Sequence, residues 1–141
     1  MNLRLANESW ESLLRAHASL MRRYQEDGIW EDLSMTEYDV LYTLAKANSP
    51  VRLNDLRDGV LLSQPALSRL IQRLVDRGLI ARAEDTTDRR ALMLKLTDSG
   101  IEKQKRVGRA HAKTVAKEMA PLEQAEMKQL KALCQKLVSK S

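Results

Sequence analysis

The stretch LLSQPALSRLIQRLVDRGLIAR, residues 61–82, constrains the fold of this chain more than any other segment. Ser63 is suited to cap a helix, Pro65 fits a first turn, and Gly78 is suited to end the helix. Apolar residues between these signals follow the i, i+3, i+4, i+7, i+8 spacing of one buried helix face: Leu67, Leu70, Ile71, Leu74 and Val75. The sequence therefore predicts an amphipathic helix that packs one face against a core.

Two shorter helices are expected before this stretch. The first begins at an N-cap on Thr36 and ends at Asn48-Ser49-Pro50. Its inward residues are Val40, Leu41 and Leu44. The second begins at an N-cap on Asn54 and runs through Leu56, Val60 and Leu61, although Gly59 weakens its end.

The segment after residue 82 has the pattern of a β-hairpin. Apolar residues alternate at Leu92, Leu94 and Leu96, and a polar, charged interruption runs from Glu84 to Arg90. Such a pattern is typical of two strands joined by an exposed tip. Two short helices followed by a hairpin is the element order of a winged helix-turn-helix, which predicts a mainly α fold of the α+β type.

The outer face of the helix within residues 61–82 carries side chains suited to hydrogen bonding: Gln64, Ser68, Arg69, Gln72 and Arg73. A helix fits the DNA major groove, where arginine can donate twice to guanine and glutamine can pair with adenine. On a helix standing alone, an ordinary solvated face would be the better interpretation. The neighbouring helices and hairpin favour a DNA-reading face.

The run LSQPALSRLIQRLVDRGLIARAEDTTDRRALMLKLTDSG strongly resembles the core of the MarR family of bacterial transcriptional regulators. The most specific pieces are SQPALSR, the turn from Leu74 to Ile80, Asp88-Arg89-Arg90, and Leu96-Thr97 followed by Gly100. The resemblance implies a homodimer whose terminal helices form the interface and whose two winged helix-turn-helix lobes grip double-stranded DNA at a pseudo-palindromic operator.

The resemblance also implies which residues contact DNA. At the start and on the outer face of the recognition helix, the matching positions are Ser63, Gln64, Pro65, Ser68, Arg69, Gln72 and Arg73. In the wing, Asp88 matches an acid that braces an arginine, Arg90, which reaches toward the minor groove, and Arg89 is a second candidate. The alternative for Asp88 and Arg90 is a surface ion pair that holds the hairpin turn.

The two end segments are expected to serve dimerisation. A long amphipathic helix ending near Asp27-Gly28, and two more at 98–119 and 122–138 separated by Pro121, cannot all bury their apolar faces on a small lobe. We therefore expect one domain over 1–141, with dimerisation helices at 1–33 and 98–141 and the DNA-binding lobe at 34–97. The small residues Gly108, Ala112 and Ala116 suit either a dimer contact or packing within the chain.

Many relatives release DNA when a small aromatic or anionic molecule binds between the dimerisation helices and the lobe. Here the residues that could line such a crevice are His17, Met21, Tyr24, Trp30, Tyr38 and Tyr42. For each one, plain core packing is the alternative and the stronger expectation.

Composition restricts the remaining function classes. A net charge of +5 and a pI near 9.5 favour a polyanionic partner, while 4% aromatic residues argue against stacking platforms for single strands. His17 and His111 are the only histidines and Cys134 the only cysteine, so we expect no metal, no cofactor and no catalysis. The single cysteine and the lack of a long apolar run favour a soluble cytoplasmic protein that does not enter the membrane.

Two functions remain from the sequence. The first is a dimeric, sequence-specific transcriptional regulator, usually a repressor, that a small effector can release. The second is a winged-helix module whose basic face binds an acidic protein. The arginines of the outer face together with Asp88-Arg89-Arg90 favour the first.

Overall fold

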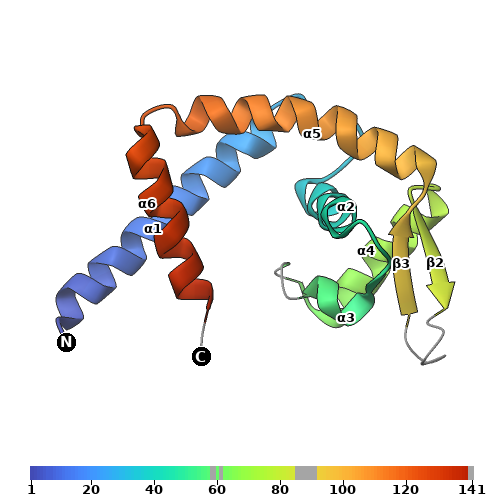
Figure 1. Ribbon diagram of the computed structural model, residues 1–141, viewed down its shortest axis with the longest axis horizontal. Helices are drawn as coiled ribbons and strands as arrows, with labels where there is room; N and C mark the ends of the chain where they lie inside the picture. The colour runs from blue at the N-terminus through green and yellow to red at the C-terminus, as the bar shows by residue number, and fades with distance from the viewer. Residues whose placement is uncertain (58–59, 61, 85–91, 140–141) are drawn as a thin grey trace. The chain divides into compact units, whose positions relative to one another are not determined.

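The structure is a computed structural model that describes residues 1–57, 60, 62–84 and 92–139. It falls into two compact units. We call Met1–Glu26 together with His111–Ser141 the helical unit, and Asp27–Ala110 the winged unit. Helix α5, Asp98–Met119, begins in the winged unit and ends in the helical unit (Figure 1).

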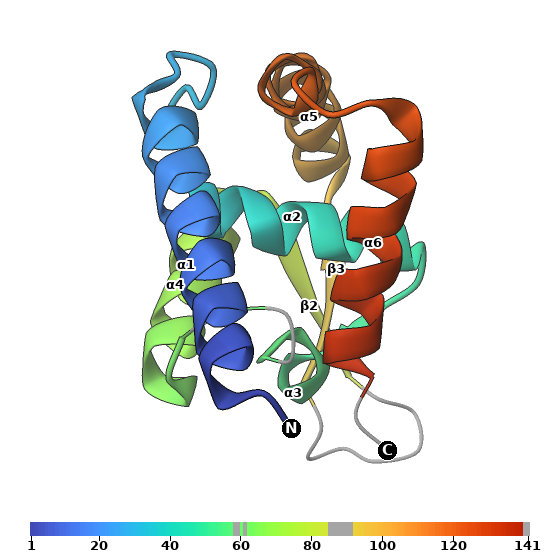
Figure 2. The ribbon, with the colours of Figure 1, turned by 90° about the vertical axis from the view of Figure 1, so that its left-hand side faces the viewer.

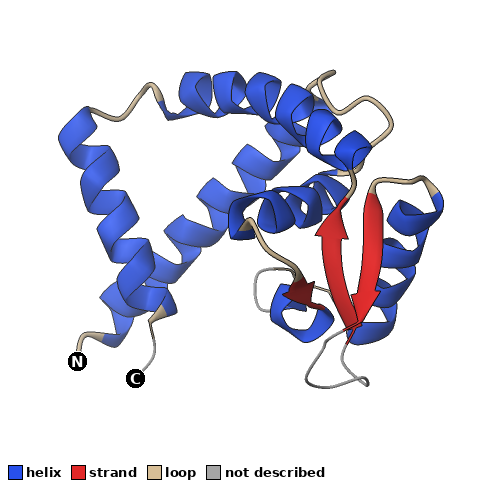
Figure 3. Ribbon diagram, turned by 45° about the vertical axis from the view of Figure 1, so that its right-hand side comes forward, coloured by secondary structure: helices blue, strands red, loops and turns tan. Residues whose placement is uncertain are grey.

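The winged unit is built from three helices, a small sheet and the start of α5. In chain order these elements are α2 (Met35–Ala47), β1 (Val51–Arg52), α3 (Leu53–Leu56), α4 (Gln64–Asp76), β2 (Ile80–Glu84) and β3 (Leu92–Leu96). The antiparallel sheet has the order β1-β3-β2, so β3 lies in the middle (Figure 3). The prediction of a mainly helical winged helix-turn-helix is confirmed.

The start of α2 differs from the prediction by two residues. Ser34, not Thr36, is the N-cap, and its Oγ accepts the backbone N–H of Glu37 at 3.0 Å. The Glu37 carboxylate in turn accepts the backbone N–H of Ser34 at 2.8 Å. Sequence reasoning overlooked this capping box because Thr36 stood closer to the apolar run. The end of α2 is as predicted, with Asn48 in the left-handed conformation at φ 53°.

The region between α2 and α4 was predicted less well. Asn54 is not an N-cap, since Arg52 holds that position without a side-chain hydrogen bond. Two residues just before α3 form β1, in which Val51 pairs with Leu94. A two-residue strand has too short a pattern to stand out in a sequence. Residues 58, 59 and 61, where the end of α3 was expected, lie outside the described residues.

The core of the winged unit collects apolar side chains from α2, α3, α4 and the sheet. Those less than 2% exposed include Val40, Leu41, Leu56, Leu67, Ile71, Leu74, Ile80 and Leu94. The predicted inward stripe of α4 is thus confirmed, except that Val75 is only half-buried at its edge. Because this stripe is buried, the opposite face of α4 must point to solvent.

The first turn of α5 packs tightly against the turn that follows α4. The Thr97 hydroxyl donates to the Gly78 carbonyl at 2.6 Å and accepts the Gly100 backbone N–H at 3.0 Å. A Cβ on Gly100 would lie 2.0 Å from the Leu79 carbonyl oxygen, so only glycine allows this approach. Gly78, which ends α4, has a φ of +75°. These contacts give a physical reason for the Leu96-Thr97 and Gly100 pattern.

The helical unit contains α1 (Leu3–Glu26), the end of α5 and α6 (Gln124–Val138), with Pro121 between the last two as predicted. Tyr24 is buried against His111, with ring centroids 5.3 Å apart, and Arg23 pairs with Glu118 at 2.6 Å. Helix α6 has no buried residue. Figure 2 shows α1 and α6 as separate helices, and apolar side chains on both are exposed, such as Trp10 at 58% and Leu133 at 61%.

The two compact units divide the chain at residues 26 and 110. The functional division into dimerisation helices at 1–33 and 98–141 and a DNA-binding lobe at 34–97 stays a prediction. The segment 27–33 and the first half of α5 join the winged unit. A Cβ on Gly108 would lie 3.0 Å from the Tyr38 hydroxyl, so α5 approaches α2 closely there. For Gly108, packing within the chain accounts for the small residue.

Candidate DNA-binding surface

The outer face of α4 carries the residues that the sequence assigned to DNA reading. Ser63 caps the helix by accepting the Ala66 backbone N–H at 3.3 Å, and Pro65 lies in the first turn. Gln72 is half-buried, and the other assigned residues are exposed: Ser63, Gln64, Pro65, Ser68, Arg69 and Arg73. The structure brings these seven onto one helix, while their contacts with DNA stay a prediction.

Two glutamines on this face are already hydrogen-bonded within the protein. Gln64 accepts a hydrogen bond from Arg57 at 3.3 Å. Gln72 donates to Asp76 at 2.7 Å and accepts from Arg82 of β2. To read a base, Gln72 would have to exchange both bonds, whereas Ser68 needs no such exchange.

Arg57 and Arg82 place positive charge beside α4 that the sequence pattern did not indicate. Arg57 ends α3, and Arg82 is exposed on β2. A strand residue facing a helix cannot be identified from helical spacing alone. The proposed wing residues Asp88, Arg89 and Arg90 lie outside the described residues.

An ion-pair cluster holds the end of α4 to the start of α2. Arg77 donates to a carboxylate oxygen of Glu37 at 3.4 Å and to the Asp32 backbone carbonyl at 3.1 Å. It also pairs with the Asp32 carboxylate at 2.8 Å. The Glu37 side chain is buried, so its charge depends on these partners and on the capping box. The orientation of α4 is therefore coupled to the residues that precede α2.

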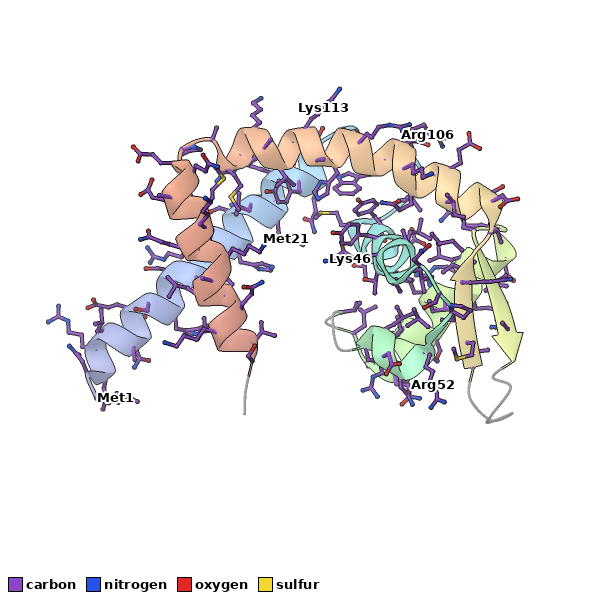
Figure 4. The ribbon with its side chains drawn as sticks, viewed as in Figure 1. Met1, Met21, Lys46, Arg52, Arg106 and Lys113 are labelled. Carbon is purple, nitrogen blue, oxygen red and sulfur yellow. The ribbon has the colours of Figure 1, made fainter. Side chains whose placement is uncertain are left out.

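Glu31 and Asp32, which precede α2, also form ion pairs with α5. Lys103 pairs with Asp32, and Arg106 donates two hydrogen bonds to Glu31, at 2.9 and 3.1 Å (Figure 4 labels Arg106). The Lys103 ammonium holds the pKa of Asp32 at about 2, and the Arg106 guanidinium lowers the pKa of Glu31. Glu31 has a φ of 58°, a conformation rare for this residue type, and the two bonds from Arg106 hold it there.

Of this cluster, only Arg77 was singled out from the sequence, as part of the turn from Leu74 to Ile80. Asp32 and Lys103 lie far apart in the chain, and helical periodicity contains no information on long-range charge pairing.

Three of the predicted effector residues form an aromatic cluster in the winged unit. Trp30 and Tyr38 are buried with ring centroids 5.5 Å apart, and Tyr42 lies 6.2 Å from Tyr38. Burial raises the pKa of the Tyr38 phenol, while a hydrogen bond with Gln104 of α5 opposes the rise. Lys46 lies 5.9 Å from the centre of the exposed Tyr42 ring. These contacts are those of a packed core with one open edge.

The other three predicted effector residues belong to α1 in the helical unit. His17 is exposed, Met21 is half-buried, and Tyr24 is buried against His111 (Figure 4 labels Met21 on α1 and Lys46 on α2). The six residues are thus divided between the two units, and a shared effector crevice stays a prediction.

Other kinds of site find little support in the part of the chain that the structure describes. Over those residues, no group of three or more histidine, cysteine or acidic side chains is arranged to hold a metal ion. No described helix combines the length and apolar character needed to cross a membrane.

Comparison with protein families finds a match that lies within the winged unit. The family model described as MarR family matches residues 31–91. The HTH-type transcriptional regulator PecS of Dickeya dadantii is 27% identical over 103 residues, which cover 72% of this chain and 62% of PecS. This chain therefore spans less than two thirds of that relative.

Solved structures of transcriptional regulators have a similar fold. The PcaV transcriptional regulator of Streptomyces coelicolor, solved with its natural ligand, has a TM-score of 0.71 and 25% identity over 93% of this chain and 89% of its own. A mutant MarR from E. coli, solved with operator DNA, has a TM-score of 0.78 and 18% identity over 99% of this chain and 100% of its own. The resemblance to the MarR family is confirmed.

Proposed function

Because the chain carries a MarR family region at residues 31–91, we propose that it works as a homodimeric repressor that binds a specific operator in the bacterial cytoplasm. The observation that carries this proposal is the exposed polar face of α4, whose serines, glutamines and arginines match the donors and acceptors of the major groove. Arg57 and Arg82 add positive charge beside that face, which favours a phosphate backbone.

The helical unit supports the dimer. Within a single chain it leaves many large apolar side chains more than one third exposed: Leu3, Leu5, Trp10, Leu13, Leu14, Met127, Leu130, Leu133, Leu137 and Val138. Apolar side chains exposed in such numbers on two helices are typical of a protein–protein interface. A second copy would cover it and would present two α4 helices to half-sites about one DNA turn, roughly 34–36 Å, apart.

The proposal includes a small effector whose binding releases the DNA. PcaV was solved with a natural ligand, and the aromatic cluster of Trp30, Tyr38 and Tyr42 has an open edge at Tyr42 beside Lys46. An aromatic or anionic molecule suits that edge, because it offers a ring face and an ammonium group.

The alternative is a winged-helix module that binds an acidic protein through the same face. Charge alone favours both functions equally. The serines and glutamines of α4 favour DNA, because base edges require hydrogen bonds in fixed positions.

An electrophoretic shift on the promoter region of the protein's own gene tests the proposal. We expect specific binding that survives competitor DNA and weakens steeply between 50 and 200 mM salt, roughly a thousandfold for six phosphate contacts. A variant carrying Gln64→Ala and Ser68→Ala is the matched control, since both residues are exposed and the fold should survive. It should retain salt-dependent binding but lose preference for the promoter. Absence of any shift at micromolar protein would favour the acidic partner.

A further inference from the structure

A cavity of about 320 Å³ lies in the winged unit between the first turn of α2 and the exposed side of α4. Ser34 and Thr36 line it from the α2 side, and Arg69 and Arg73 line it from α4. The rest of its lining is apolar. A liquid water molecule occupies about 30 Å³, so the cavity has room for a phosphate group.

The two arginines give this cavity an excess of positive charge. Arg69 and Arg73 are four residues apart on one helix, which places their side chains next to each other. The acid beside them is Glu37, whose carboxylate oxygen lies 3.9 Å from the Arg73 Nε and also accepts a hydrogen bond from Arg77. Arg69 pairs with no acid in the described parts of the chain. An oxyanion placed between the arginines would relieve their repulsion.

The α2 side supplies donors that suit the same anion. The Ser34 oxygen accepts the Glu37 backbone N–H, which leaves its own hydrogen free to donate. The hydroxyl of Thr36, half-buried in the first turn, is a second donor. Two hydroxyls facing two guanidinium groups form a donor set that suits phosphate, because guanidinium binds phosphate oxygens in pairs.

We propose that this cavity seats one phosphate of the DNA backbone, and that Arg69 and Arg73 hold that phosphate instead of reading a base. The inference rests on the proposed DNA-binding function. From the sequence alone, both arginines suit guanine equally well. Their place in a cavity shared with α2 assigns them to the backbone and leaves base reading to Gln64 and Ser68. Helix α2 then fixes the depth at which α4 enters the groove.

The first test compares Arg69→Ala with wild type on an operator and its single-base variants. We expect affinity to fall about tenfold or more per half-site, equally on every variant. The slope of log affinity against log salt should become shallower by about 0.9 per half-site. Thr36→Val should reproduce the pattern with a smaller loss. Arg109→Ala, an exposed arginine on α5 outside the cavity, is the matched control and should change none of these quantities.

The second test replaces one operator phosphate at a time with a neutral methylphosphonate. One position per half-site should weaken wild-type binding and leave the Arg69→Ala variant unaffected. The proposed phosphate site would be overturned if Arg69→Ala lost discrimination at a single base pair of the operator, or if its salt slope were the same as that of the wild type. Micromolar binding of inorganic phosphate that Arg69→Ala abolishes without loss of operator affinity would also overturn it. A wild-type protein that selects no operator would instead overturn the proposed function.

Discussion

The two units of this chain bury their apolar residues in different ways. In the winged unit, Leu41, Leu67 and Leu74 are completely buried among elements of the same unit. In the helical unit, Leu133 of α6 is 61% exposed, and Tyr24 is the one buried residue of α1. The winged unit therefore has its own hydrophobic core, while the helical unit exposes apolar side chains of the kind found in protein–protein interfaces. This unequal burial within one chain is the observation that supports the proposed dimer.

The largest expected effect separates the two kinds of burial. Leu41→Ala in the winged unit should lower the free energy of unfolding by about 2–5 kcal/mol, because a cavity replaces completely buried methyl groups. Leu133→Ala, the same truncation in the helical unit, should leave the winged unit intact. It should weaken the dimer at least tenfold, since burying a leucine contributes about 1.5–3 kcal/mol.

Urea unfolding and light scattering at several chain concentrations distinguish these outcomes. The wild type should scatter as twice the 16.1 kDa chain mass, and Leu133→Ala should dissociate on dilution. A wild type that remains monomeric at tens of micromolar would remove the argument for the helical unit as an interface.

The same contrast explains how much the sequence could predict. Helix α4 follows a periodic pattern, so its inward and outward faces were predicted residue by residue. For the hairpin, the alternation at Leu92, Leu94 and Leu96 predicted the second strand, of which Leu94 is buried. The capping box at Ser34, strand β1 and the pairing of Arg77 with Glu37 were not predicted. The partners of β1 and of Arg77 meet only after the chain has folded. The capping box, in contrast, is a local S-x-x-E pattern that could have been identified in the sequence. Periodicity predicts which face is buried and contains no information on which charges pair.

The site was predicted to a similar degree. The seven residues of α4 were placed on one surface, yet the bonds that engage Gln72 and the cavity beside Arg69 need the positions of β2 and α2. The aromatic residues thought to bind an effector were identified by type alone, and the structure divides them between the units.

The next largest effect tests which part of α5 packs most tightly within the winged unit. Gly100→Ala would place a Cβ 2.0 Å from the Leu79 carbonyl oxygen, a backbone atom that cannot move alone. We expect a loss of about 2 kcal/mol or more in thermal or urea unfolding. Gly108→Ala is the matched control on the same helix. Its Cβ would meet the flexible end of Gln104 at 2.9 Å and the Tyr38 hydroxyl at 3.0 Å.

The control should change stability little, because the helix preference of alanine, worth about 1 kcal/mol over glycine, offsets the crowding. A reversed order, with Gly108→Ala the more harmful substitution, would show that the hold of the winged unit on α5 is strongest near its boundary at Ala110 and not at its first turn.

The smallest effect concerns the charges that join the winged unit to α5. The Lys103 ammonium, together with Arg77, holds the pKa of Asp32 at about 2, below its ordinary value of 3.8. The folded pKa is the lower one, so this stabilisation is complete above the unfolded value and is lost as pH falls toward 2. Asp32→Asn should therefore cost a constant amount above about pH 5, and the difference from wild type should shrink between about pH 5 and 2. We expect a loss of about 1 kcal/mol or less in the free energy of unfolding, because the Asp32 side chain is 64% exposed and solvent screens its partners.

Urea unfolding of both proteins from pH 2 to 7 measures the difference. In a Lys103→Met background the pH-dependent part should decrease without vanishing, since Arg77 still lies 2.8 Å from the carboxylate. A difference that stays constant down to pH 2 would mean that Asp32 is not held by charge, and that α5 is held in the winged unit by the packing at Gly100 and by the Arg106–Glu31 pair without help from Asp32.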